Sequence, residues 1–374
     1  MVAAGEDRGK RSPRSMTTTP PDRSERSATA VGTTSSNPAP SGLSQELSLR
    51  LHDLMLRARV LEERLITMYK QGDGYFWIGG PGEEAFNVPL GLLVDKGQGV
   101  DHDYLHLHYR SSGTLLAMGA DPVDSLRQMK NTATDPYSRG RNFAGHYSVK
   151  KWNVAPVSSP IEVQFSIAIG TAQAQSKRGG GKGITIVQGG DAGTAEADFA
   201  TALVWSSRKG QELPLLMIVT NNRYGISTPY AGQHGEDQIA DRGKAFGMPT
   251  ATIDGNDPEV SYAAIKKALD YVRTERKPYL LEAMVSRLHG HSSASGANFV
   301  KDEVDCVTRF EQRLEEKKLL SRARMDEMRA KYTQELLLAS QSVREEPQPK
   351  PESVWDYVFA ENEQSKNETL GGEK

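Results

Sequence analysis

Between residues 184 and 285 the chain alternates short β-rich runs with longer stretches of helical periodicity. The β-rich runs cover residues 184–187, 215–219, 250–253 and 280–285, and the helical stretches cover residues 195–207, 239–246 and 260–273. Strands that alternate with helices are typical of a parallel sheet, because each connection must carry the chain back to the start of the next strand. The sequence therefore predicts an α/β fold in which a parallel sheet is flanked by helices.

The segments around this region set the expected domain limits. Residues 1–42 are rich in Ser, Thr, Pro and Arg and poor in large apolar side chains, so we predict a disordered N-terminal extension. An apolar pattern at three- and four-residue spacing begins near Ser44 and ends at Gly72, which predicts the first helix. We expect residues 43–302 to form the α/β domain and residues 303–374 to form a charged helical extension and tail outside the sheet.

The composition disfavours several classes of function. A net charge of -2 argues against a protein that binds nucleic acid mainly through electrostatics. The single cysteine, Cys306, can form neither an internal disulfide nor a multi-cysteine metal site, which fits a reducing bacterial cytoplasm. No apolar run is long enough to span a membrane. The acidic residues among the first 42 are atypical of a mitochondrial transit peptide, so a mitochondrial location is not expected.

Small and polar residues follow two of the predicted strands. Residues 188–193 read Gln-Gly-Gly-Asp-Ala-Gly and open the next helix, where small residues and helix N–H groups suit an anion. Asp191 would lie beside that anion, and the two negative charges require a cation such as Mg²⁺ between them. Asn222 follows the next strand and supplies a neutral oxygen of the type that Mg²⁺ accepts. Each segment alone could be an ordinary turn, but together they predict one ligand site at the carboxyl edge of the sheet.

This ordered pair of segments resembles the thiamine diphosphate motif. The resemblance implies a thiamine-diphosphate-binding fold in which Asp191, Asn222 and the backbone carbonyl of Tyr224 hold the Mg²⁺ of the cofactor. It extends over about residues 47–309, where the chain is similar to the alpha subunits of the thiamine-dependent component of 2-oxo acid dehydrogenases.

Further segments carry the same resemblance. Residues 82–85 (Gly-Glu-Glu-Ala) resemble an early turn of the family, and Tyr109-Arg110 resembles its diphosphate-contacting pair. Residues 158–161 resemble the segment whose apolar residue, here Ile161, supports the bent cofactor. Residues 287–292 resemble a mobile loop that brings an arginine and a histidine to the active site, which makes His291 the implied catalytic residue. The cofactor-binding residues implied are Tyr109, Arg110, Ser159, Ile161, Gly190, Asp191, Ala192, Gly193, Asn222, Arg287 and His291.

Some positions depart from the family pattern or resist assignment. Ala192 replaces a glycine of the motif, and its methyl group could crowd the diphosphate. Val163 stands where branched-chain members have a threonine that helps to bind potassium, and a valine side chain cannot ligate a metal. His106 and His108 have no third ligand at a suitable spacing, so a metal site is not expected there. We expect His146 to be structural.

The resemblance implies oxidative decarboxylation of a 2-oxo acid and acyl transfer to lipoyl-lysine on an acyltransferase component. It also implies a separate beta subunit in a heterotetramer of two alpha and two beta chains, because the segments found here account for only the diphosphate half of the cofactor. Phe76-Trp77-Ile78 and residues 226–229 favour branched-chain substrates. The alternatives are a pyruvate dehydrogenase alpha subunit, a stand-alone thiamine-dependent carboligase, and a non-catalytic subunit that binds a partner.

Overall fold

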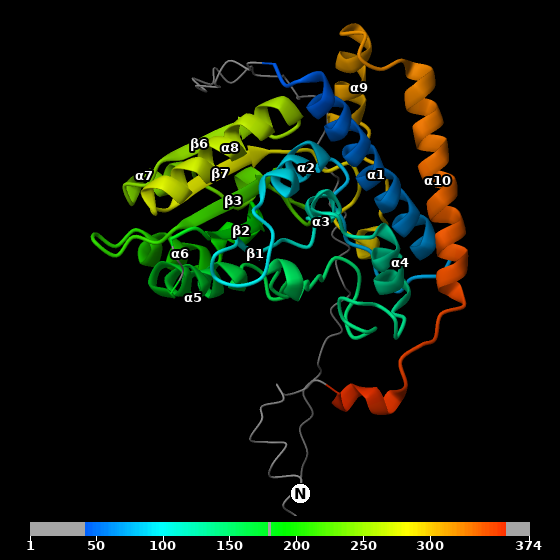
Figure 1. The fold of residues 1–374 in the computed structure, drawn as a ribbon, viewed down its shortest axis with the longest axis horizontal. Coiled ribbons are helices and arrows are strands. Elements are labelled where there is room, and N and C mark those ends of the chain that lie inside the picture. The colour runs from blue at the N-terminus through cyan, green and yellow to red at the C-terminus, as the bar shows by residue number, and fades with distance from the viewer. Residues whose placement is uncertain (1–41, 179–180, 357–374) are drawn as a thin grey trace, which may run out of the picture. The chain divides into compact units, whose positions relative to one another are not determined.

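The computed structural model describes residues 42–178 and 181–356, so most of the extension predicted to be disordered lies outside the described residues. The central element is a sheet of five parallel strands in the order β1-β2-β3-β7-β6 (Figure 1). The strands are β1 (Tyr104–His106), β2 (Thr185–Gly190), β3 (Leu215–Asn221), β6 (Thr250–Asp254) and β7 (Tyr279–Met284). The predicted α/β fold with a parallel sheet is confirmed.

Helices cover both faces of the sheet. One face packs against α2 (Glu84–Leu93) and α8 (Pro258–Glu275), and the other packs against α5 (Val163–Arg178) and α6 (Ala197–Ser206). Neighbouring residues of a strand point to opposite faces: Ile186 of β2 joins the core beneath α2 and α8, whereas Val187 joins the core beneath α5 and α6. Because both faces are buried, the strands are almost continuously apolar, which is why their sequence does not alternate between apolar and polar residues.

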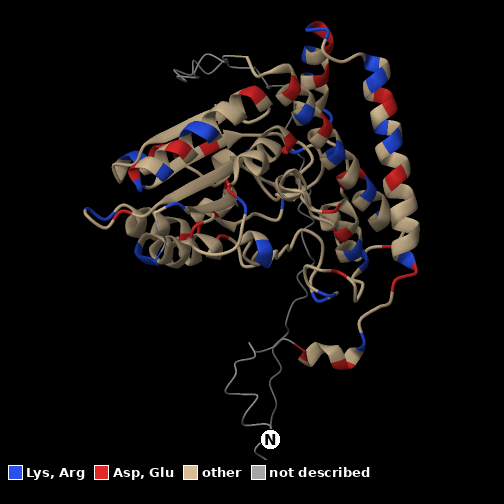
Figure 2. Ribbon diagram, in the orientation of Figure 1, with Lys and Arg blue, Asp and Glu red and all other residues tan. Residues whose placement is uncertain are grey.

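A layer of helices lies away from the sheet. It comprises α1 (Gln45–Lys70), α3 (Ser112–Met118), α4 (Pro122–Lys130), α9 (Cys306–Glu316) and α10 (Arg322–Arg344). Helix α10 packs along α1 and α4, and α9 contacts α1 and α2 (Figure 1). Figure 2 shows basic and acidic residues interspersed along α10, in contrast to the largely uncharged strands. The C-terminal helices thus pack outside the sheet.

Short elements complete the described chain. They are η1 (Lys150–Trp152), η2 (Ala192–Ala195), β4 (Tyr224–Gly225), β5 (Thr228–Pro229), η3 (Tyr230–Gly232), α7 (Asp241–Ala245), η4 (Ser293–Ser295) and η5 (Pro351–Trp355). Strands β4 and β5 form an antiparallel pair directly after β3. No helix in the described ranges is long and apolar enough to cross a bilayer.

A buried ion pair ties three helices together. Arg59 of α1 donates two hydrogen bonds to the carboxylate of Glu84 in α2, at 2.6 and 3.0 Å, and a third to Asp305 at 2.7 Å. Arg59 and Glu84 are only 4% and 3% exposed. Asp305 in turn caps α9 by accepting from the N–H groups of Val307 and Thr308. The arrangement fixes α9 against α1 and α2. Because both side chains are buried, water could not take the place of either charged partner if that partner were removed.

We predict that Arg59→Met lowers the free energy of unfolding by about 3–5 kcal/mol, because it leaves the Glu84 carboxylate buried without its cation. Lys266→Met is the matched control, since Lys266 pairs with Asp270 at 2.5 Å while both side chains are 57% exposed. The control should change stability by less than about 1 kcal/mol. Urea unfolding measures both values, and equal effects of the two substitutions would contradict the proposed importance of the buried pair.

Candidate active site

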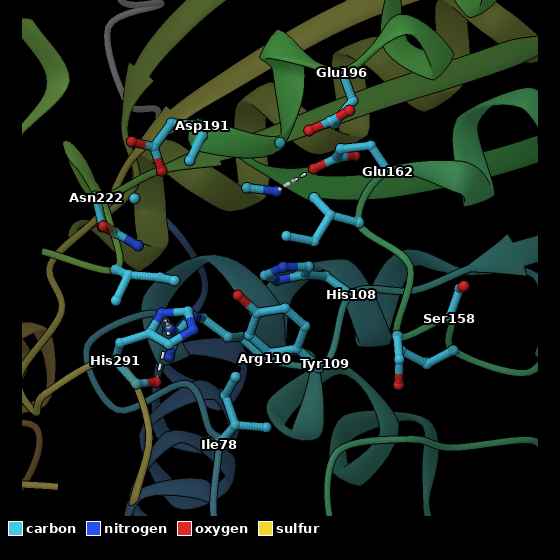
Figure 3. A pocket seen from close by; sticks show the side chains of 18 of the residues that line it. Ile78, His108, Tyr109, Arg110, Ser158, Glu162, Asp191, Glu196, Asn222 and His291 are labelled. Carbon is cyan, nitrogen blue, oxygen red and sulfur yellow. Dashed lines mark hydrogen bonds between the residues drawn. The ribbon is translucent and has the colours of Figure 1, made fainter. Parts of the chain in front are cut away.

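A cavity of about 640 Å³ lies at the carboxyl edge of the sheet. Its walls come from the segments that follow β1, β2 and β3 and from the loop that carries His291 (Figure 3). All but one of the residues predicted to bind cofactor or metal line this cavity, namely Tyr109, Arg110, Ser159, Ile161, Gly190, Asp191, Ala192, Gly193, Asn222, Tyr224 and His291. The parallel sheet explains this convergence, because it brings the carboxyl ends of strands that are distant in sequence to one edge.

Asp191 and Asn222 meet because β2 and β3 pair in register. Gly190, at the end of β2, lies opposite Thr220 of β3. Asp191 is 1% exposed, and its Oδ2 has no hydrogen-bond partner among the described residues. Burial raises the pKa of this carboxyl to about 6, although nearby backbone N–H groups, including that of Asn222, act in the opposite direction. A buried carboxylate oxygen that accepts no hydrogen bond is better suited to binding a cation than to stabilising an ordinary turn.

The oxygen donors around Asp191 fit a hard divalent cation that takes its remaining oxygen ligands from a bound anion. Asn222 contributes a side-chain oxygen, which also accepts from the Tyr224 N–H at 3.1 Å. In the described part of the chain, no group of three or more His, Cys, Asp or Glu side chains is arranged to hold a metal. A cation here therefore needs oxygens from backbone carbonyls and from a bound anion, which is the coordination typical of Mg²⁺ with phosphates.

Arg110 and His291 lie together in the wall of the cavity. The Arg110 guanidinium donates to Nδ1 of His291 at 3.2 Å and to its backbone carbonyl at 3.1 Å (Figure 3). It also packs against the ring of Tyr109, 5.1 Å from the ring centroid. Burial, followed by the charges of Arg110 and Arg287, lowers the pKa of His291 to about 4. His291 is therefore neutral near pH 7, and because Nδ1 accepts from Arg110, its proton lies on Nε2.

Glu83 lies beneath this wall. Its carboxylate is 1% exposed and 3.9 Å from Nε of Arg110. Burial raises the pKa of Glu83 to about 8, against the attraction of Arg110 and hydrogen bonds from Thr220 and Asn87. The sequence placed Glu83 in a family turn without a role, and the structure puts it beside the arginine that lines the cavity.

Apolar side chains form another part of the wall. Phe76 and Phe143 meet edge to face with ring centroids 4.9 Å apart, and Ile78 and Val157 lie beside the same cavity. Trp77, which the sequence analysis grouped with Phe76 and Ile78, is fully buried elsewhere and donates from Nε1 to Glu62 at 2.9 Å. The bulk expected from this tripeptide therefore comes from Phe76 and Ile78, with Phe143 added from a loop for which no pattern predicted a role.

One departure from the family pattern, Ala192, has a local explanation. Ala192 faces Gly225 of β4, where a Cβ would collide with the alanine methyl group, so the missing side chain at Gly225 makes room for Ala192.

Ser159 pairs with Nε2 of His146 at 2.8 Å, which puts this histidine in the cavity wall. Arg287 is the predicted residue that does not line the cavity. It donates to the Ile226 carbonyl at 3.0 Å and lies over the Tyr224 ring.

Two polar residues of the wall escaped sequence reasoning about the site. His108 is 7% exposed, lies against the Tyr109 ring, and has an unpartnered Nδ1 among the described residues. Glu162 is 2% exposed and accepts from the N–H of Gly190 at 3.1 Å. His108 was considered in the sequence only with His106 as a metal ligand, and Glu162 belongs to no spacing pattern. Their adjacency to Tyr109 and Ile161 was the remaining signal for a place in the site.

Comparison with known proteins gives consistent results. A model of the family described as "Dehydrogenase E1 component" matches residues 52–352. The chain is 31% identical over 333 residues to the 2-oxoisovalerate dehydrogenase subunit alpha of Bacillus subtilis (strain 168), covering 85% of this chain and 97% of that protein. It is 30% identical over 282 residues to the mitochondrial 2-oxoisovalerate dehydrogenase subunit alpha of Caenorhabditis elegans, covering 73% and 63%. A similar subunit of Arabidopsis thaliana is 28% identical over 339 residues, covering 88% and 70%.

We predict that Glu83→Gln reduces the loss of stability at alkaline pH. The pKa of Glu83 is about 8 in the folded protein and about 4.3 in an unfolded chain. Between these values the folded state holds a proton that the unfolded state releases, so this carboxyl lowers stability as pH rises from about 4.5 to about 8. Relative to the unchanged protein, the glutamine variant should gain more than about 1 kcal/mol between about pH 5 and about pH 8.5. Urea unfolding at both pH values measures the gain, and parallel pH profiles would contradict it.

Proposed function

Because the chain belongs to the dehydrogenase E1 component family, we propose that it is the alpha subunit of a branched-chain 2-oxo acid dehydrogenase. The observation that carries the proposal is that Asp191 and Asn222 lie together at the carboxyl edge of the sheet. One oxygen of the buried Asp191 carboxylate has no hydrogen-bond partner among the described residues. The relatives named above are 2-oxoisovalerate dehydrogenase subunits, which supports a branched-chain substrate. The bacterial relative also favours a cytoplasmic location.

The family implies thiamine diphosphate as the cofactor. When bound, it supplies the electron sink that allows carbon dioxide to leave a 2-oxo acid. We assign Mg²⁺ to Asp191, Asn222 and the backbone carbonyl of Tyr224, since this donor set needs a phosphate to complete it. Tyr109 and Arg110 are the proposed diphosphate contacts, and the small residues Gly190, Ala192 and Gly193 let that anion approach the backbone. Ile161, which lines the same cavity, would support the cofactor from below.

His291 is the proposed catalytic residue. Its hydrogen bond from Arg110 leaves the proton on Nε2, so the neutral ring can donate a hydrogen bond to the acyl group during transfer. A low pKa suits this role, because the ring neither adds charge to the cavity nor changes protonation near pH 7. Arg110 therefore has two tasks, which are to attract the diphosphate and to set the tautomer of His291.

The cavity wall supports a bulky apolar substrate. The Phe76 and Phe143 pair, together with Ile78 and Val157, offers apolar surface where a short acyl group would leave empty space. A pyruvate-specific alpha subunit is therefore less well supported by this wall than a branched-chain one. The basic side of the cavity would orient the carboxylate of the 2-oxo acid.

A partner beta subunit is part of the proposal, in a heterotetramer that delivers the acyl group to a lipoyl acyltransferase component. Ile161 lines the cavity and yet is 60% exposed. On the adjoining helices, Ile167 of α5 and Val204 and Trp205 of α6 are 52%, 48% and 46% exposed. Large apolar side chains that remain exposed on neighbouring helices are typical of a surface covered by another chain. This surface favours a shared site over a stand-alone carboligase.

The metal assignment predicts that Asp191→Asn abolishes Mg²⁺-dependent binding of thiamine diphosphate, because it removes the charged protein ligand. Cofactor at 100 times its dissociation constant should stabilise the unchanged alpha–beta complex by about 2.7 kcal/mol, and the variant should lose this gain. Thermal unfolding with and without cofactor and Mg²⁺ measures it. The control is Asp241→Asn, in an exposed ion pair with Lys244, which should keep the full shift. An undiminished shift in Asp191→Asn would remove Asp191 from the metal site.

The shared-site assignment predicts that the purified chain is inactive until the beta subunit is added. The test measures decarboxylation of 2-oxoisovalerate and of pyruvate with an artificial electron acceptor, with and without the beta chain. We expect activity only with both chains. The kcat/KM should be at least about tenfold higher for 2-oxoisovalerate than for pyruvate, since a few buried methyl groups are worth that factor. Turnover by the single chain would favour the carboligase alternative. A preference for pyruvate would correct the substrate, and inactivity of the complex would favour the non-catalytic alternative.

A further inference from the structure

Glu162 is an ionisable residue of the cavity wall to which the proposed function assigns no task. It lies between Ile161 and the first residue of α5 and is 2% exposed. Its φ of +62° falls in the left-handed region that side chains other than glycine seldom adopt. Such strain persists where the surrounding structure holds the residue in place, and it is concentrated at functional sites. The conformation is therefore a reason to ask what the carboxyl does.

The loop after β2 is shaped around the Glu162 carboxyl. Oε1 accepts from the backbone N–H of Gly190 at 3.1 Å. A Cβ added at Gly189 or at Gly193 would collide with the Glu162 side chain, so both glycines leave the space that it occupies. The glycines of residues 189–193 thus accommodate this carboxyl as well as any anion at the neighbouring N–H groups. Glu162 is held in a fixed position between the β2 edge and the cavity (Figure 3).

This carboxyl has no cationic partner in the ranges that the structure describes. Its hydrogen bonds come from the Gly190 N–H and, at 3.5 Å, from the Gln164 amide, and no lysine or arginine forms an ion pair with it. Its charged neighbours are the carboxylates of Asp191, Asp198 and Glu196, which add to burial in raising the pKa of Glu162 to about 8. The basic side chains of the site, Arg110 and Arg287, act on His291 instead.

The cavity is consequently divided by charge. One part joins Arg110 and the Asp191–Asn222 pair, and it suits an anion together with its metal ion. The other part contains the carboxyls of Glu162 and Glu196, which Figure 3 shows on neighbouring segments of the wall, and no lysine or arginine lines the cavity there. A ligand that fits both parts has an anionic end and a cationic group. Thiamine diphosphate has this character, with its diphosphate and its positively charged thiazolium ring.

On the basis of the proposed function, we propose that Glu162 is the counter-charge for the cationic ring of the cofactor. The Gly190 N–H and the space left by Gly189 and Gly193 hold its carboxyl in position. A cationic ring beside this carboxyl would stabilise its charged form against burial and against the repulsion from Asp191 and Glu196. The alternative is a purely structural role, in which Glu162 supports the turn that presents Asp191.

The test compares three ligands on the purified alpha–beta complex by titration calorimetry in the presence of Mg²⁺. Thiamine diphosphate has a cationic ring, deazathiamine diphosphate has a neutral ring of the same shape, and inorganic pyrophosphate has no ring. We expect Glu162→Gln to weaken thiamine diphosphate about tenfold and to change the other two ligands less than about twofold, because only the first interaction loses a charge pair. Glu316→Gln, which changes an exposed carboxyl at the end of α9 outside the cavity wall, should leave all three affinities within about twofold.

A second variant guards against misfolding. Glu162→Gly removes the carboxyl and relieves the positive φ, so it should fold and show the same selective loss as the glutamine variant. Equal weakening of all three ligands would establish the structural role and overturn the proposal, and so would unchanged affinity for thiamine diphosphate. If the unchanged complex binds pyrophosphate but prefers neither ring, the cofactor assignment itself fails. The failure of the cofactor assignment would thus be seen in the unchanged complex, whereas the failure of the Glu162 proposal would be seen only in the variants.

Discussion

The pairing of β2 with β3 is the constraint on which the site depends. Because the strands are parallel and in register from Thr185 to Gly190, they end together, and the residues that follow them are brought to the same point. Asp191 and Asn222 are 31 positions apart in the chain and become neighbours only through this pairing. The remaining parts of the cavity are added around this point: β1 contributes the segment from His108 to Arg110, and the chain after β7 contributes His291. A change of register between β2 and β3 would separate the two proposed metal ligands even if every side chain were retained.

The cavity combines groups that are unfavourable in a folded protein without a ligand. Glu83, Glu162 and Asp191 are buried carboxyls whose pKa values are raised by burial, and the Asp191 Oδ2 lacks a partner among the described residues. Such groups reduce the stability of an empty site, because burial removes water from charges without pairing all of them. The fixed helices around the sheet supply the opposing stability, and the Arg59–Glu84 pair shows how charge is buried when it is fully matched. Binding of an oppositely charged ligand would pair these buried charges, and this pairing would contribute part of the free energy of binding.

The exposed apolar residues of α5, of α6 and of the segment before α5 extend this reasoning beyond a single chain. Ile161, Ile167 and Trp205 lie on or beside α5 and α6, whose other faces form the core under the sheet. A helix that is apolar on two sides is stable only if a second surface covers the outer one. In the proposed complex the beta subunit covers it, and the same contact would exclude water from the cavity. Closure of the cavity and assembly of the proposed complex would then be one event, in which Ile161, exposed in the single chain, becomes covered.

The sequence by itself determined the fold class, the order of the elements and the family, because these depend on periodicity and on short local motifs. The alternation from residue 184 to residue 285 predicts the parallel sheet, and the Gly190-Asp191 and Asn221-Asn222 segments predict a site at its edge. Side-chain directions were less accessible. Trp77 belongs to a tripeptide that looked like one wall, yet it turns into the core while Phe143 enters the cavity from a distant loop. Arg287 turns toward the Ile226 carbonyl, and Glu162 fits the space beside Gly189 and Gly193. These directions are set by contacts between segments that are far apart in the chain, so only the tertiary structure could decide them.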